Sequence, residues 1–112
     1  MPIYITQGRY TRDAVKGMVA RPEDRADAVA RLVSKAGGRL IGHYLTFGEY
    51  DFLTIVEAPS ETQIAAALLA AVSAGGITDM RTTVALTSLE AKGVYSAASD
   101  LVSAFRTPGN VG

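Results

Sequence analysis

The sequence contains no cysteine and only one histidine, His43. Without cysteine the chain can form neither a disulfide nor a thiolate metal site, and it has no cysteine nucleophile. This absence is typical of proteins from a reducing compartment, so we expect a cytoplasmic location. A transition-metal site would need carboxylates to supplement a single histidine. We therefore expect no metal and no other cofactor.

The chain also lacks an excess of charge of either sign. Its 11 basic and 11 acidic side chains cancel, and the pI is about 6.6. Such a chain has no electrostatic field to attract phosphate backbones or anionic lipids, so we expect neither nucleic acid nor membrane partners. The longest apolar run, residues 64–72, is far shorter than the roughly 20 residues that a membrane-spanning helix needs. The amino terminus lacks the pattern of a secretory signal, so we expect a soluble, unprocessed chain.

Hydrophobic periodicity predicts six elements in the order βαββαβ. Alternating β-branched and aromatic residues mark the strands, steps of three and four mark the helices, and glycine pairs end two of the helical segments. We predict strands at 3–7, 40–47, 50–57 and 80–87, a helix from Thr11 that Pro22 interrupts and that resumes over 23–36, and a helix from Ser60 to residue 74. This order predicts a ferredoxin-like α+β fold, an antiparallel sheet with its helices on one face.

The other face of such a sheet needs a cover. In so short a chain we expect a second copy to provide it, sheet against sheet, in a homo-oligomer that is a dimer or larger. Residues 88–112 do not belong to this core. Apolar residues at steps of three and four predict an extra amphipathic helix over 95–106, packed on its own subunit or on a neighbour, and a frayed tail at 107–112. We therefore divide the chain into a domain at 1–87 and an extension at 88–112.

Two side chains are candidates for acid–base chemistry. Strict alternation places His43 on one strand face with Ile41 and Leu45, and Leu40 on the opposite face. A lone histidine between aliphatic neighbours is either a hydrogen-bonded structural residue or a general base. Asp51 lies at the mouth of the predicted hairpin. It acts as a base if a dry pocket raises its pKa, or it caps the turn by accepting backbone N–H bonds.

Other polar and aromatic residues interrupt the apolar strands and are candidate ligand-binding residues. In a split βαβ sheet the first strand lies centrally, so such groups can converge across neighbouring strands. An arginine in such a cluster can pair a carboxylate or enolate while tyrosine donates a hydrogen bond. A satisfied interface network is the other interpretation. The candidate residues are Tyr4, Thr6, Tyr44, Tyr50 and Arg81.

Three blocks of the sequence resemble the GYD-domain family of small bacterial proteins. They are "PIYITQGRYT", "GGRLIGHYLTFGEYDFLTIVEAP" and "MRTTVAL", and the second contains the glycine, tyrosine and aspartate of the family name as Gly48, Tyr50 and Asp51. The resemblance covers residues 2–87. It implies a ferredoxin-like fold of the dimeric α/β-barrel type. It implies no single activity, because this fold group includes monooxygenases, haem-degrading enzymes, lactone isomerases and ligand-sensing domains.

These observations lead to one functional expectation with two alternatives. We expect a small oligomeric domain that binds an aromatic or carboxylate-bearing organic molecule in a pocket on the sheet. The first alternative is a cofactor-independent enzyme for a phenolic or lactone substrate, with His43 or Asp51 as the base and Arg81 stabilising an oxyanion. The second is a structural or assembly module without a ligand.

Overall fold

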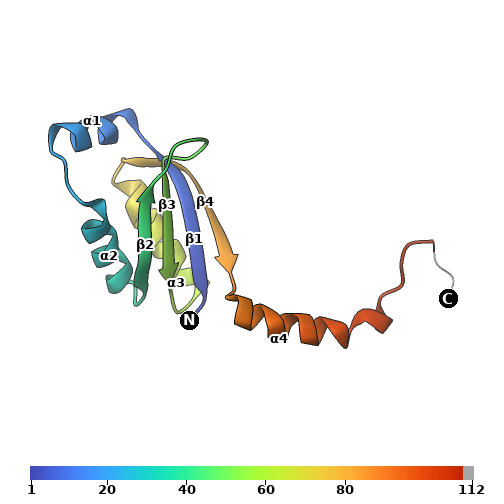
Figure 1. Ribbon diagram of the computed structural model, residues 1–112. Helices are drawn as coiled ribbons and strands as arrows, with labels where there is room; N and C mark the ends of the chain where they lie inside the picture. Colours follow the sequence, from blue (N-terminus) through green and yellow to red (C-terminus); the bar gives the residue numbers. More distant parts are fainter. Residues whose placement is uncertain (110–112) are drawn as a thin grey trace.

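The fold is a four-stranded antiparallel sheet with helices against one face, as Figure 1 shows. The structure is a computed structural model that describes residues 1–109. The strands, β1 (Ile3–Tyr10), β2 (Arg39–Leu45), β3 (Phe52–Glu57) and β4 (Ile77–Ala85), lie in the order β2-β3-β1-β4. The helices of this unit are α1 (Arg12–Ala20), α2 (Arg25–Lys35) and α3 (Glu61–Ser73). This arrangement confirms the predicted ferredoxin-like α+β fold.

Polar side chains fix where these helices begin. The side chains of Thr11, Asp24 and Ser60 each accept a hydrogen bond from a backbone N–H in the first turn of the helix that follows. Such caps satisfy donors that have no partner within the helix. The break at Pro22 is confirmed, and α2 begins at Arg25 rather than at residue 23 because Asp24 is the capping residue.

The core lies between the sheet and the two helices α2 and α3. Alternate residues of β3 point toward these helices, and Phe52, Thr54 and Val56 are all buried. The buried cluster around them contains Tyr4, Val33, Val56, Ala58 and Ile64, with Val29, Leu40 and Leu68 packed against it. The opposite face carries half-buried aliphatic residues, and no helix covers it in Figure 1. We call this surface the open face.

A β-bulge in β2 changes the faces that strict alternation predicts. Leu40 pairs with Val56, but the next pair is Gly42 with Ile55, so one extra residue is accommodated at Ile41. His43 therefore pairs with Thr54 and lies on the helix-covered face, the same face as Leu40. The prediction that Leu40 and His43 occupy opposite faces is wrong, because a bulge shifts the alternation by one residue.

A fourth helix leaves the sheet instead of packing on it. After Leu86 and Thr87, helix α4 (Ser88–Ser99) and a short 3₁₀ helix, η1 (Val102–Ala104), extend away from the domain (Figure 1). The extra C-terminal helix is confirmed, but it begins earlier than predicted. The side chains and backbone N–H groups of Thr87 and Glu90 form a reciprocal capping box at 2.9 and 3.1 Å, which starts a helix there. Residues 110–112 of the predicted tail lie outside the described residues.

Candidate functional site

The helix-covered side of the molecule contains a groove of about 630 Å³ between α1, α2, α3 and the start of β4. Its walls are mostly small or apolar side chains, including Ala14, Met18, Ala28 and Ala71. A narrower pocket of about 70 Å³ shares part of these walls and reaches the sheet. An apolar cleft with few polar groups is the usual form of a small-molecule site.

The floor of the inner pocket carries a chain of three polar side chains. His43 Nδ1 lies 2.8 Å from Thr54 Oγ1, and His43 Nε2 lies 3.4 Å from the Tyr10 hydroxyl. Phe52 packs beside both rings, with ring-centroid distances of 5.1 Å to Tyr10 and 6.0 Å to His43. The imidazole is thus held at one nitrogen by Thr54, while its other nitrogen faces Tyr10 and the pocket.

Burial sets the protonation of this pair. It lowers the pKa of His43 below its ordinary value of 6.5; nearby Arg25 acts in the same direction and Asp24 opposes it. Burial also raises the pKa of Tyr10, an effect that Asp51 reinforces and Arg25 opposes. Near neutral pH the pair is therefore a neutral imidazole and a protonated phenol, which together can accept and donate a hydrogen bond.

Charged side chains gather at the rim of the groove. Arg25, the first residue of α2, borders both the groove and the inner pocket, and its guanidinium is 2.8 Å from the Glu23 carboxylate. Arg21 lies on the same rim. Two guanidinium groups and one carboxylate leave a net positive rim, and guanidinium groups bind carboxylates well.

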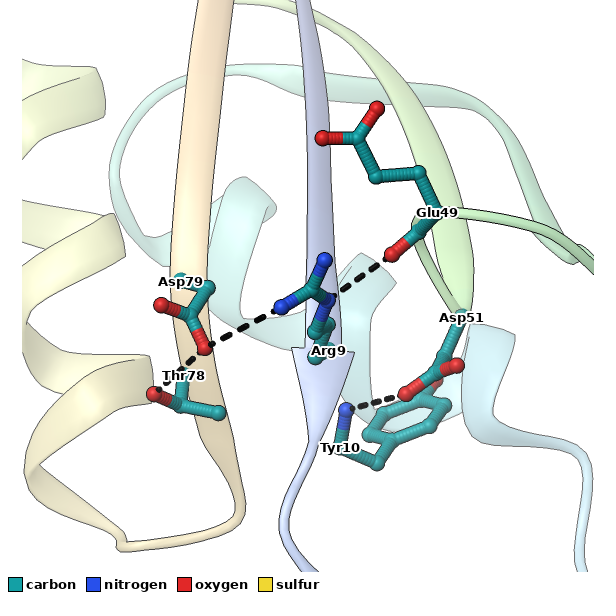
Figure 2. A network of polar contacts seen from close by, with 6 residues as sticks. All are labelled: Arg9, Tyr10, Glu49, Asp51, Thr78 and Asp79. Atoms are coloured by element: carbon teal, nitrogen blue, oxygen red, sulfur yellow. Dashed lines mark hydrogen bonds and ion pairs between the residues drawn. The ribbon is translucent and has the colours of Figure 1, made fainter.

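The hairpin turn is attached to the end of β1 (Figure 2). Asp51 Oδ2 accepts a hydrogen bond of 2.9 Å from the backbone N–H of Tyr10, and the Asp51 N–H donates to the Gly8 carbonyl at 2.8 Å. The Arg9 Nε–H donates to the Glu49 carbonyl at 2.8 Å. Asp51 accepts an N–H from the neighbouring strand rather than from the turn, and so fixes the segment whose ring, Tyr10, enters the pocket.

A second, polar hollow lies beside this turn. It has a volume of about 290 Å³ and is bordered by Arg9, Glu49, Tyr50, Asp79, Met80 and Arg81. The Arg9 guanidinium lies 5.7 Å from the centre of the Tyr50 ring and 4.0 Å from the Asp79 carboxylate. Asp79 has a positive φ of 53°, a conformation that aspartate tolerates better than most residues. The two basic and two acidic side chains balance one another.

The predicted site residues do not form one site. They lie in different parts of the structure, because alternate residues of a strand face opposite sides of the sheet. Thr6 and His43 line the inner pocket. Tyr4 is packed in the core at 2% exposure, and Tyr44 is exposed. The hollow brings Tyr50 and Arg81 together. Asp51 lies between the two sites, where it holds β1.

Sequence reasoning missed three polar residues of the pocket, Tyr10, Arg25 and Thr54. Tyr10 continues the alternation of Tyr4 and Thr6, but the first strand was predicted to stop at residue 7, whereas β1 extends to residue 10. A predicted first strand that continued to residue 10 would have placed Tyr10 on the same face as Tyr4 and Thr6. Nothing in the local pattern distinguishes Arg25 from the other charged residues of its helix.

Neither a metal-binding cluster nor a membrane-spanning helix is found in the part of the chain that the structure describes. Within residues 1–109, no group of three or more His, Asp or Glu side chains is arranged to hold a metal ion. None of the helices in this part of the chain has the length and apolar character needed to cross a membrane.

Comparison with known proteins identifies relatives by sequence and by fold. A Thermus thermophilus protein named "Glutamine synthetase and cystathionine beta-lyase binding protein" is 31% identical over 80 residues, which cover 71% of this chain and 84% of the relative. Among solved structures, a protein from Thermus thermophilus has a TM-score of 0.51 at 15% identity, over 78% of this chain and 95% of that one. A Neisseria meningitidis transcriptional regulator, solved with L-Met, has a TM-score of 0.55 at 15% identity.

That regulator match covers 77% of this chain but only 50% of the regulator. At these identities, the two solved structures establish similarity of fold alone. The family comparison is more specific, because the model of the GYD domain matches residues 4–94 and so extends from β1 into α4. The chain belongs to the GYD-domain family.

Proposed function

We propose that this protein binds a small organic molecule with an apolar or aromatic body and an anionic group in the groove that ends at His43. The observation that carries the proposal is the gradient of chemistry along this groove: a basic rim, apolar walls and a neutral polar floor. In this arrangement Arg25 pairs the anionic group, and the His43–Tyr10 pair binds a hydroxyl or carbonyl at the other end.

The relatives supply useful probes for this proposal. The Neisseria regulator was solved with L-Met, a molecule that combines a carboxylate with an apolar side chain. The Thermus relative is named for binding two enzymes, so a protein partner is a further kind of ligand to test. The groove favours the small molecule, because its inner end is narrow and lies beneath the helices.

Titration calorimetry with phenylacetate, 4-hydroxybenzoate and L-methionine tests the proposal. We expect at least one of these carboxylates to bind, and Arg25→Gln to weaken that binding by about ten- to a hundredfold, since a hydrogen-bonded charge pair contributes roughly 1.5–3 kcal/mol. Arg31→Gln is the matched control, because Arg31 lies on the same helix and is exposed outside the groove. No binding by any probe, or equal affinities in the two variants, contradicts the proposal.

A second candidate function is proton abstraction from a phenolic or lactone substrate. The His43–Tyr10 pair favours it, because a neutral imidazole can take a proton at Nε2 while the Tyr10 hydroxyl donates a hydrogen bond to the oxyanion that forms. In D₂O, a lactone substrate should exchange its acidic C–H proton for deuterium in the presence of the protein, as observed by NMR. Exchange should be lost in His43→Gln. Exchange at the same rate in that variant would exclude His43 as the base.

We further propose that the protein is a homo-oligomer in which a second copy covers the open face. Alternate strand residues place the half-buried side chains of Ile3, Ile5, Leu53 and Ile55 on that face. An apolar sheet face of this breadth is normally covered in a soluble assembly. Ile5→Asp should lower the mass that light scattering reports, whereas Lys35→Asp at the exposed end of α2 should not. An unchanged mass in Ile5→Asp would contradict packing through this face.

A further inference from the structure

Helix α1 packs only loosely on the rest of the domain. None of its residues is buried, and Val15 and Val19 are 45% and 74% exposed. By contrast, α2 contributes Val33 and α3 contributes Ile64 to the core cluster. In Figure 1, α1 lies apart from these two helices, at the end of the sheet that β1 reaches. Packing therefore does little to hold α1 in one place, and a helix as short as this one is only marginally stable without packing.

One side of α1 is apolar, but the groove covers only part of it. Four apolar residues at steps of one, three and one share that side of the helix, namely Ala14, Val15, Met18 and Val19. Ala14 and Met18 line the groove, whereas the two valines are not among its walls. A helix that lies deeper in a groove covers a wider arc of its surface. A closer position of α1 would therefore bury the valines as well.

The opposite walls of the groove leave room for such a movement. They are formed by side chains of α2 and α3, among them the small side chains of Ala28, Ala70 and Ala74, and small side chains let a second helix approach closely. The space between these walls and α1 has a volume of about 630 Å³. Both walls are apolar, so removing water from them is favourable. A ligand with an apolar body fills the deeper part of this space and gives α1 a surface on which to close.

Hydrogen bonds hold α1 at its start. The Thr11 N–H donates to the Gly76 carbonyl at 3.0 Å, and the Thr11 hydroxyl donates to the Gly75 carbonyl at 3.2 Å. The preceding residue, Tyr10, is held through its backbone N–H by the Asp51 carboxylate at 2.9 Å. The start of α1 is thus attached both to the turn before β4 and to the turn before β3.

The far end of α1 has no comparable attachment. Within residues 1–109, no hydrogen bond or ion pair joins residues 12–20 to another helix or strand. Residues 21–24 connect α1 to α2 without regular secondary structure, and Pro22 prevents the helix from continuing. A helix that is held at one end and free at the other moves mainly about the held end. Thr11 is therefore the pivot.

We propose that α1 is a lid that pivots at Thr11 and closes over a ligand bound in the groove. This inference rests on the ligand-binding function proposed above and adds how ligand entry and release are controlled. The closed position buries apolar surface of α1 on the ligand, so a bound ligand stabilises that position relative to the open one of this structure. Release then requires the lid to open, which slows dissociation. Asp51, which positions Tyr10 in the pocket, also anchors the pivot.

A fluorescent reporter outside the groove detects closure. The chain has no tryptophan, so Val19→Trp introduces a single one on the part of the apolar side that the open groove does not cover. On saturation with whichever of phenylacetate, 4-hydroxybenzoate and L-methionine binds, we expect its emission to shift to the blue and acrylamide to quench it less. Ala20→Trp is the matched control, because Ala20 is exposed on the polar side of the helix with Lys16. An unchanged Val19→Trp spectrum with the ligand bound, or the same shift in both variants, overturns the lid.

Dissociation kinetics test whether closure controls release. We expect Val19→Asp to accelerate release of the same ligand by about tenfold or more, because burial of one valine side chain corresponds to roughly that factor. Ala20→Asp adds the same charge at the neighbouring position and should change the release rate little. The widths of the ligand's NMR lines report both rates. Equal release rates in the two variants contradict the lid.

Hydrogen exchange tests the mobility of α1 in the absence of a ligand. The amides of α1 should exchange faster than those of α2 and α3 in the free protein, and should slow when the ligand binds. If α1 is as well protected as α3 in the free protein, it is a fixed part of the fold and the lid is rejected.

The outcomes separate the lid from the function on which it depends. Binding that Arg25→Gln weakens, without any change in the emission of Val19→Trp, keeps the groove as the ligand site and rejects the lid. Binding with the expected blue shift supports both. No binding by any of the three carboxylates rejects both.

Discussion

At the scale of single residues, His43 is the most informative side chain of the pocket. It is the only histidine in the sequence, so its titration can be observed without interference. Thr54 holds one ring nitrogen and Tyr10 faces the other, and burial favours the neutral ring. The bulge at Ile41 is what brings this ring under the helices.

The lowered pKa of His43 predicts a specific dependence of stability on pH. Because the folded-state pKa lies below the unfolded value of 6.5, the unfolded chain binds more protons than the folded chain as the solution becomes acidic. The contribution of His43 to stability is therefore complete above pH 6.5 and is lost as the pH falls through the folded-state pKa. Urea denaturation at pH 7.5 and 5.5 should show a larger loss for the wild type than for His43→Gln.

NMR provides an independent check of the same prediction. The ring protons of His43 should titrate below pH 6.5 in the folded protein. A folded-state pKa at or above 6.5, or equal pH dependence of the wild type and His43→Gln, would contradict the burial argument.

At the scale of elements, the α2–β2 connection depends on a glycine that cannot be replaced without rearrangement. A Cβ atom at Gly38 would lie 2.3 Å from the Glu57 carbonyl oxygen and 3.1 Å from a Val33 methyl group. The oxygen belongs to the backbone of β3, so it cannot move aside as a flexible side chain can. The close approach of this turn to β3 joins the helix layer to the sheet.

Gly38→Ala should therefore lower the free energy of unfolding by about 1–3 kcal/mol, the usual cost of overpacking. Urea denaturation measures this change. Gly17→Ala is a suitable control, because Gly17 lies within α1 and a Cβ there would meet no atom within 4 Å. We expect that variant to be as stable as the wild type or up to about 1 kcal/mol more stable. A Gly38→Ala variant of wild-type stability would contradict the close approach.

At the scale of the whole molecule, the protein combines a ligand-sized groove with a C-terminal segment, α4 and η1, that extends away from the sheet. These features lie on different parts of the structure, since the groove is formed by α1, α2 and α3 and the C-terminal segment follows β4. The turn of the GYD stretch lies near the groove, where Asp51 fixes the end of β1. The segment with Gly48, Tyr50 and Asp51 therefore helps to position Tyr10 in the pocket, because Asp51 binds the Tyr10 backbone N–H.

The extended shape gives a prediction for the separated chain. At low concentration the protein should have a radius of gyration near the 18.6 Å of this structure in small-angle X-ray scattering, because helix α4 and the residues after it extend away from the sheet. A value of about 13 Å, that of a compact chain of this length, would show that this C-terminal segment packs on its own domain.

Much of this architecture was predictable because it follows from local physical chemistry. Apolar residues that alternate along the chain identified the strands, and apolar residues at steps of three and four identified the helices. Capping residues such as Thr11 and Ser60 indicated where helices begin. The predicted bounds of the last helix, 95–106, are wrong because the capping box of Thr87 and Glu90 starts α4 at Ser88, and the helix ends at Ser99. The pocket was only partly predictable, since Arg25 belongs to it through the packing of α2 and carries no local signal.

The sequence by itself determined the element order, the family and the absence of cysteine chemistry, because these depend on residue type and spacing. Only the tertiary structure decided which side chains share a face and which surfaces remain uncovered. A single bulged residue moved His43 to the face of Leu40, and alternation separated Tyr4 from Tyr44. Such outcomes depend on pairing between distant segments, and no local pattern in the chain specifies where that pairing shifts by one residue.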